Sequence, residues 1–593
     1  DGSSDVGSSD LLGSRELVCR ARVRGFGVTL VRVRFRPFAR GFDVAVLIGA
    51  GLVGLFYLNR IFTPWPLYAG DEGAYLIRGL YGDLLAGHPE RHPTLQPVGN
   101  TAYLALIRLV QGLTDNLLPW LRLIGAAGYV GGVWIVHRAV RMRQAPRVAG
   151  WVLPAALAYP FHRFVVTAMP EGVFVLVLAA MVAASALWAA RRPWAHAGLM
   201  GTLCALLVLI KPHGVTMVPA MVILLAALMA AGQRRPLPAL GQLTLFVVVF
   251  LATGAGIELL AGDAGSALTF FMGAAYGDHF GRVPEQPGRT AAITLLSLGS
   301  ATLLLAGAPL LAGGLAVVQR WRRREPLERD EAAFVLVAAA FLAALVMILV
   351  FALKVSAIPG EGGRLWGRYF EFYVPLLWIV AGGPLAGLWR AARWSRRLLL
   401  AALPMAGLFG LVAAWRLGVL LTPWDSGALS AFYLPHLDRW GFVPPAPYLL
   451  LSAGVVNVLA LALLLGCDLI RAWAATFVAL GLISTHFDDA WVSKEIAGAR
   501  AAAQQDLQVA RGLAPADSLP AVIAYDHNMS HMAFMAYEGE VQILVRPPGP
   551  VPPALLEGRS QVVTIGGEPL PAPWRVTYAG EALRIYQREG VAP

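Results

Sequence analysis

Long apolar runs recur along this chain of 593 residues, and they constrain its fold more than any motif does. Hydrophobic residues make up 57% of the sequence, charged residues make up 14%, and the mean hydropathy is +0.62. Because a membrane-spanning helix needs about 20 mostly apolar residues, these runs predict an all-α polytopic membrane protein with about 13 transmembrane helices. The predicted helices start near residues 43, 117, 148, 171, 195, 214, 239, 292, 333, 372, 398, 447 and 472.

The formal net charge of +12 indicates membrane orientation and not nucleic-acid binding. Basic residues stand in short blocks between apolar runs, such as RAVRMRQAPR, QRWRRREPLER and RAARWSRR. If the N-terminus is cytoplasmic, these blocks fall in the inner loops, as the positive-inside rule requires. Only three of the 48 basic residues are lysine, which favours a GC-rich bacterium. We therefore predict a protein of the bacterial cytoplasmic (inner) membrane, with an extracytoplasmic C-terminus and no nucleic-acid partner.

The composition divides the chain into three parts. Residues 1–42 are predicted to form a basic cytoplasmic tail, residues 43–485 a transmembrane domain, and residues 486–593 an extracytoplasmic domain. In the last part, SKEIAGARAAAQQDLQVARGL predicts a helix, and PAVIAY, VQILVR, QVVTI, WRVTY and ALRIYQ predict short strands. The C-terminal part is therefore expected to be a small α/β domain.

The first outer loop, residues 63–116, carries the strongest local signal. Leu76, Ile77, Leu80 and Leu84 recur at helical spacing, which predicts a helix lying in the membrane interface with its apolar stripe toward the lipid. The polar start of this helix holds two adjacent carboxylates.

Asp71 and Glu72 are the predicted catalytic pair. A carboxylate at the mouth of a membrane cavity is suited to act as a general base toward a hydroxyl, because partial burial raises its proton affinity and fixes its direction. The alternative is purely structural: Asp71 would cap the helix, and Glu72 would be favourable in its first turn.

A resemblance favours the catalytic interpretation. The string GDEGAYLIRGLY resembles the Asp-Glu-x-x-Tyr signature in the first outer loop of the GT-C membrane glycosyltransferases, the group that includes protein O-mannosyltransferases and lipid A aminoarabinose transferases. The segments HPTLQPVGNTAYLALIRLV, LLPWLRLIGAAGYVGGVWIVHRAVR, AMPEGVFVLVLAAMVAASAL, KPHGVTMVPAMVILL and GRYFEFYVPLL resemble later parts of the same family, in the same order, over residues 43 to 390. Two departures are notable: His92-Pro93-Thr94 replaces the family's Pro-Pro, and the WWDYG motif of oligosaccharyltransferases is absent.

The resemblance implies a GT-C fold and an inverting transfer of a sugar from a polyprenyl phosphate to a cell-envelope lipid or glycan. Asp71 would be the general base, and the departing lipid phosphate would need cations. A compact ammonium can contact phosphate as a point charge, and an arginine can fork to two of its oxygens; the alternative for a lysine is snorkelling at a helix end. The predicted phosphate-binding residues are Lys211, His213, Arg368, Tyr369, Arg364 and Lys354. The residues predicted to orient the acceptor or the helix are Arg78, Tyr75, Glu171 and His92.

The residues leave several alternatives open. Glu171 follows Pro170 at a helix start, where an acid is favourable for purely structural reasons. His88, Glu90 and His92 have a loop spacing that matches no strong metal site, so no cofactor is predicted and dependence on a divalent metal stays open. A glycan polymerase or ligase would depend on the late outer loops. A secondary transporter would place its charges at the membrane midplane, within broken helices.

Overall fold

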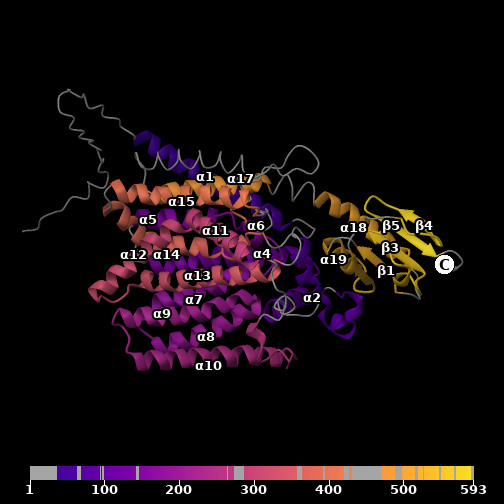
Figure 1. Cartoon of the computed structure of the whole chain (residues 1–593), viewed down its shortest axis with the longest axis horizontal. Coiled ribbons are helices and arrows are strands. Elements are labelled where there is room, and N and C mark those ends of the chain that lie inside the picture. Colours follow the sequence, from indigo (N-terminus) through magenta and orange to yellow (C-terminus); the bar gives the residue numbers. More distant parts are fainter. Residues whose placement is uncertain are drawn as a thin grey trace, which may run out of the picture.

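The computed structural model describes most of the chain as a long helical bundle followed by a small sheet domain, which lie end to end (Figure 1). The described residues are 36–62, 69–93, 95, 99–141, 146–263, 265–272, 286–356, 363–391, 394–419, 426–429, 469–487, 497–514, 519–524, 527–546, 549–565 and 569–588.

Nine helices within these ranges are long and apolar enough to cross a membrane, so the protein is a multi-pass membrane protein. They are α1 (Arg36–Ile61), α4 (Leu117–Arg141), α7 (Glu171–Trp188), α8 (Pro193–Ile210), α9 (Met217–Ala230, continuous with the 3-10 turn η2, Pro212–Thr216), α10 (Pro236–Leu260), α11 (Pro287–Leu305), α13 (Arg329–Val355) and α15 (Trp394–Arg416). The remaining helices of the bundle are α2 (Ala69–Gly87), α3 (Thr101–Leu113), α5 (Pro146–Ala158), α6 (His162–Val165), α12 (Gly307–Arg323), α14 (Tyr373–Ala391) and α17 (Leu469–Phe487), with the short 3-10 turns η1 (Pro89–Arg91), η3 (Phe270–Met272) and η5 (Gly367–Tyr369).

The predicted fold class is confirmed, but the predicted count of spans is not. Nine of the predicted starts correspond to the nine spans, and those near 372 and 472 fall on the shorter apolar helices α14 and α17. The start near 148 becomes α5, a helix of 13 residues. The start near 447 lies outside the described residues.

The run that starts near 292 folds as two helices, α11 and α12, because a proline follows their junction. Pro309 has no N–H to donate to the carbonyl four residues earlier, so helix α11 cannot continue through it. That carbonyl, on Leu305, instead accepts a hydrogen bond from Trp378 Nε1 of α14 at 2.8 Å. A buried tryptophan thus satisfies the backbone group that the break exposes.

Glycines bring α4 and α7 into unusually close contact. A Cβ atom added at Gly172 of α7 would lie 2.1 Å from the Gly125 carbonyl oxygen of α4, and one at Gly128 would lie 2.7 Å from the Gly172 carbonyl oxygen. Small residues at such contacts let helix backbones approach one another within a membrane. This packing holds the first turn of α7, which begins at Glu171, against α4.

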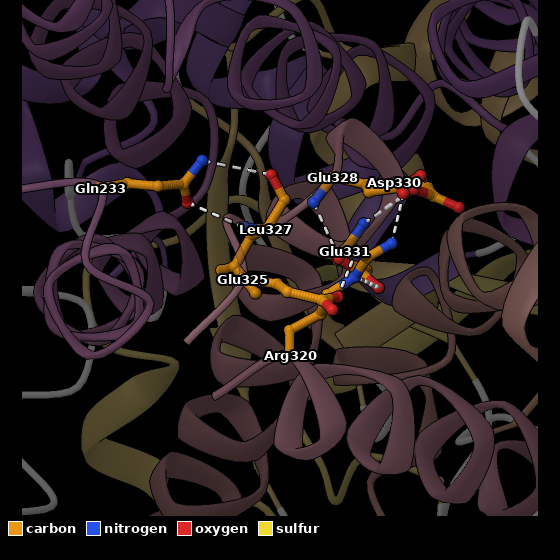
Figure 2. A network of polar contacts seen from close by, with 7 residues as sticks. All are labelled: Gln233, Arg320, Glu325, Leu327, Glu328, Asp330 and Glu331. Atoms are coloured by element: carbon orange, nitrogen blue, oxygen red, sulfur yellow. Dashed lines mark hydrogen bonds and ion pairs between the residues drawn. The ribbon is translucent and has the colours of Figure 1, made fainter. Parts of the chain in front are cut away.

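A polar network joins two helix connections at the end of the bundle that lies away from the sheet domain (Figures 1 and 2). The Gln233 side chain exchanges two hydrogen bonds with the backbone of Leu327, at 3.2 and 3.0 Å. Arg320 near the end of α12 pairs with Glu325 at 2.8 Å, with Glu331 at 3.2 Å and with Glu328. Glu328 and Glu331 also form a capping box at the start of α13. The network therefore fixes how α12 turns into α13.

The C-terminal part is a five-stranded sheet in the order β2-β1-β3-β5-β4. Strands β2, β1 and β3 are parallel, and β3, β5 and β4 are antiparallel. Its elements are α18 (Ala497–Gly512), β1 (Ala521–Ala524), α19 (His527–Ala536), β2 (Gln542–Val545), the 3-10 turn η8 (Pro553–Leu555), β3 (Gln561–Ile565), β4 (Trp574–Ala579) and β5 (Leu583–Arg588). All five predicted strands and the predicted helix are present. Helix α19 was not predicted, although Met529, Met532, Ala533 and Ala536 follow a helical spacing.

Helix α2 is enclosed by protein on two sides, which corrects the prediction that its apolar stripe faces lipid. Leu76 packs with Tyr103 and Ile107 of α3 against the bundle. Ile77 and Leu84 pack with α18 and α19 in the core of the C-terminal domain. Leu76 is 2% exposed and Ile77 is fully buried. The apolar stripe is present, but helix α3 and the C-terminal domain cover it in place of lipid.

The contact between α2 and α19 gives a direct test of this arrangement. A Cβ atom at Gly73 would lie 2.9 Å from His531 Cβ, so Gly73→Val should overpack the contact and lower the free energy of unfolding by about 1–3 kcal/mol. Thermal unfolding of the purified protein in detergent measures the effect. Gly87→Val is the matched control, because a Cβ atom there meets nothing within 4 Å. Equal losses in the two variants would contradict the packing described here.

Candidate active site

Four segments that are distant in the sequence meet at the end of the bundle nearest the C-terminal domain. They are the first turn of α2, the first turn of α7, the end of α8 and the η5 turn before α14. Together they contribute Asp71, Glu171, Lys211 and Arg368, which we call the charge cluster. The sequence predicted that Asp71 shares one chamber with Lys211 and Arg368, and the structure brings these three together.

The four side chains form a continuous series of ion pairs. Arg368 Nη2 lies 2.5 Å from Asp71 Oδ2, and Arg368 Nε lies 3.9 Å from Glu171 Oε1. Lys211 Nζ lies 2.5 Å from the same Glu171 oxygen. Two carboxylates and two cations therefore alternate in one line, and their formal charges cancel.

Exposure distinguishes the two ends of this line. The Glu171 side chain is 1% exposed and that of Lys211 is 4% exposed, whereas the Asp71 side chain is 47% exposed. Arg368, at 12%, lies between them. Asp71 is thus the member of the cluster that a soluble or lipid-borne group can reach first.

The cluster keeps Asp71 ionised. Partial burial acts to raise the pKa of the carboxyl, as the sequence predicted, but the adjacent Arg368, assisted by Lys211 and Arg364, outweighs this effect. The pKa of Asp71 therefore lies below its usual value, which corrects the prediction that its proton affinity is raised. The nearby Tyr75 shows the opposite effect, because burial and the charges of Glu171 and Asp71 hold the pKa of its phenol well above the usual range. At neutral pH, Asp71 is therefore a carboxylate and Tyr75 a neutral hydrogen-bond donor.

Aromatic rings line the cationic part of the cluster. The Tyr369 ring stacks on the His213 ring, with ring centroids 4.3 Å apart, and on the Trp366 ring, with ring centroids 5.7 Å apart. Lys211 Nζ lies 5.1 Å from the Tyr369 ring centre. The Arg364 guanidinium lies 4.0 Å from the centre of the Trp366 ring. Rings in these positions hold the cations in place through cation–π contacts.

The turn after α8 explains why Lys211 points into the cluster. Pro212 disfavours a helical conformation at Lys211, whose backbone is extended at φ −156° and ψ 128°. Gly214 then packs so closely on α8 that a Cβ atom there would lie 2.6 Å from the Leu207 carbonyl carbon. Buried Asn100, in the segment between α1 and α4, donates to the Ile210 carbonyl oxygen at 2.7 Å. The loop that carries Asp71 is thereby also tied to the Lys211 turn.

Glu72 occupies a different environment from Asp71, although both were predicted to be catalytic. It is fully buried and lies 3.3 Å from Arg122 Nη2 of α4, which is also fully buried. The Ala168 backbone N–H donates to the same Glu72 oxygen at 2.6 Å. Successive side chains on a helix diverge by about 100°, so the neighbour of a residue in the cluster faces elsewhere. The structure places Glu72 between α2 and α4, as a residue that positions the helix.

The other predicted residues are spread around the cluster. Tyr75 packs edge to face against Tyr103 at 5.6 Å, and Arg78 lies two turns along α2 from Asp71. His92 is buried against His531 and Phe534 of α19, with ring centroids 5.4 Å apart in both pairs. It therefore belongs to the contact with the C-terminal domain. Lys354 is partly exposed in the last turn of α13, outside the ion pairs that define the cluster.

Three residues of structural importance were not selected from the sequence: Arg122, Asn100 and Glu371. Glu371 is fully buried and accepts hydrogen bonds from Ser426 Oγ and from the Gly427 and Ala428 N–H groups. Burial raises the pKa of its carboxyl to about 7, despite these donors. Glu371 lies three residues after Arg368, and an acid at the start of an apolar helix was the available signal.

The described residues contain no group of three or more His, Cys, Asp or Glu side chains that could hold a metal ion. His88 and Glu90, two of the residues considered as ligands, are exposed and hydrogen-bond to each other at 3.1 Å. The third, His92, faces α19. The loop histidines therefore do not converge.

The fold defines the chain as a polytopic membrane protein of helices with a small C-terminal sheet domain. It is similar to the crystal structure of ArnT from Cupriavidus metallidurans in the apo state, with a TM-score of 0.54, 16% sequence identity, and coverage of 93% of this chain and 98% of that one. The structure of the same protein bound to undecaprenyl phosphate gives a TM-score of 0.51 at 15% identity, over 92% and 98% of the two chains. ArnT is a lipid A aminoarabinose transferase of the GT-C superfamily, so the fold implied by the sequence resemblance is confirmed. No family model and no curated protein sequence matches the chain.

Proposed function

We propose that the protein is a glycosyltransferase that moves a sugar from a polyprenyl phosphate to a cell-envelope lipid or glycan, on the outer face of the bacterial cytoplasmic membrane. The observation that carries this proposal is the charge cluster, which joins a half-exposed carboxylate to two largely buried cations. An ArnT of the same fold binds undecaprenyl phosphate, which supports a lipid phosphate as the leaving group.

In this proposal, Asp71 takes the proton of the acceptor hydroxyl while the acceptor oxygen attacks the anomeric carbon. The stereochemistry is inverted because the nucleophile and the leaving phosphate lie on opposite sides of the carbon. Lys211 and Arg368 stabilise the charge that develops on the phosphate. Tyr369, Arg364 and His213 shape the same region, and Tyr75 donates a hydrogen bond to the acceptor.

The experiment is a transfer assay with the purified full-length protein in liposomes that contain an undecaprenyl-phosphate-linked sugar and an envelope-lipid extract. We expect undecaprenyl phosphate to be released at a rate that depends on the acceptor, and mass spectrometry to find the sugar on a lipid or glycan. Mass spectrometry of envelope glycans from a strain lacking the protein should show the same modification missing. A donor that stays intact with every acceptor fraction would contradict the proposal.

Two other functions predict different results in the same liposomes. A secondary transporter would move solute across the membrane without forming product, and it would place its charges at the midplane. The charge cluster lies instead at helix ends, which favours the transferase. A glycan polymerase or ligase would lose activity when late outer loops change and would tolerate substitution of Asp71. The segments 273–285 and 430–446 of those loops lie outside the described residues.

A further inference from the structure

Within the charge cluster, an incoming phosphate must compete for a cation that already has a carboxylate partner. Lys211 contacts Glu171 at 2.5 Å, and Arg368 contacts Asp71 at 2.5 Å. The Lys211 pair is almost completely buried, so little solvent screening weakens it. The Arg368 pair has a half-exposed carboxylate, so solvent screens it more than it screens the Lys211 pair. Arg368 is therefore the cation that the cluster can release most easily.

The geometry lets Arg368 change partners without leaving its place. Its Nε lies 3.9 Å from the buried Glu171 carboxylate, whereas its terminal Nη2 contacts Asp71. The guanidinium carbon lies 5.2 Å from the Tyr369 ring centre and 5.8 Å from that of Phe164. A guanidinium has five N–H donors in a fixed fork, so its outer edge can exchange one anion for another while its inner edge stays held.

We propose that Arg368 is a shared cation, which passes from Asp71 to the lipid phosphate as sugar transfer proceeds. This inference rests on the proposed function and deepens it. It also assigns the ion pair between Asp71 and Arg368 a role in the reaction, beyond holding α2 and η5 together.

The charge balance of the reaction gives the physical reason. The acceptor oxygen bonds to the anomeric carbon, the bond from that carbon to the phosphate oxygen breaks, and its electron pair leaves with the phosphate. The acceptor proton goes to Asp71, which loses its negative charge, while the phosphate gains one as it changes from a diester to a monoester. One negative charge thus moves from one neighbour of Arg368 to another. The total charge in the site stays constant, so no uncompensated charge has to be formed near the buried pair.

The test uses undecaprenyl phosphate as the probe and the purified full-length protein in detergent. In Asp71→Asn, residue 71 is neutral, as it would be after proton transfer, and Arg368 is released. We expect this variant to bind undecaprenyl phosphate about threefold to tenfold more tightly than the wild type. The matched control is Asp83→Asn, which removes the same charge from a 94% exposed side chain on the same helix and should leave binding unchanged.

The Asp71→Asn substitution made in an Arg368→Gln variant tests whether Arg368 causes the tighter binding. In Arg368→Gln, the added Asp71→Asn change should no longer tighten binding, because the shared cation is gone. An Asp71→Asn variant that binds like the wild type would overturn the inference, and so would a gain of equal size in the Arg368→Gln background. If Asp71→Asn does not fold, Asp71→Ala carries the same expectation. Failure of the wild type to bind undecaprenyl phosphate would contradict the proposed function itself, so the two failures are distinguishable.

Discussion

Replacing Asp71 with asparagine is expected to reduce the rate of sugar transfer by about 10²–10⁴-fold, the range typical for loss of a positioned general base. Asparagine preserves the shape of the side chain but cannot accept the acceptor's proton. The folded state should change little, because the Asp71 side chain is 47% exposed and its pair with Arg368 is only partly desolvated. The loss should therefore appear in kcat and not in the yield of folded protein.

The measurement is release of undecaprenyl phosphate by the purified variant in liposomes, with thermal unfolding recorded on the same sample. Asp83→Asn on the same helix is again the control, and it should retain full activity. Together with the binding experiment, the expected result is that one substitution slows turnover and strengthens binding of the leaving lipid. A fully active Asp71→Asn variant would contradict the assignment of the base.

Replacing Glu72 with alanine is expected to have a different effect, a loss of about 3–5 kcal/mol in the free energy of unfolding. The Arg122 guanidinium is fully buried, and in this variant it would lose the carboxylate 3.3 Å away. The Ala168 N–H would lose the same acceptor. Removing one member of a buried ion pair is far more costly than removing a half-exposed one, because the remaining charge stays desolvated.

Thermal unfolding in detergent measures this loss, and a double variant separates charge from packing. Replacing both Glu72 and Arg122 with leucine removes the two charges together, and buried pairs exchanged for apolar residues are often neutral in stability. We expect this double variant to recover most of the stability that Glu72→Ala loses. If Glu72→Ala were as stable as the wild type but inactive, Glu72 would be a catalytic residue, as the sequence alone suggested.

Local patterns predicted the elements of this protein well. Hydropathy along the chain identified the spans, because the cost of placing a residue in lipid depends on that residue and its near neighbours. Short runs rich in β-branched and other apolar residues identified the five C-terminal strands in the same way. The exceptions also have local causes that could have been recognised: Pro309 divides a predicted span, and the spacing of the methionines in α19 indicates a helix.

Local patterns could not predict the different surroundings of the neighbours Asp71 and Glu72. Both are acids in the first turn of one helix, and the sequence gives no reason to separate them. Their directions differ by about 100°, but which direction leads to Arg368 and which to Arg122 depends on where α4 and η5 lie. The apolar stripe of α2 is similar, because the pattern required an apolar partner without specifying whether lipid or protein supplies it.

By itself, the sequence determined that this chain is a multi-pass membrane protein of helices with a small C-terminal domain, and it indicated Asp71, Lys211 and Arg368 as the residues of interest. Only the tertiary structure decided that these three form one line of charges with Glu171, and that Glu72 instead holds α2 against α4. The physical reason is that transfer energies and helical periodicity act over a few residues, whereas ion pairs depend on distances between segments far apart in the chain.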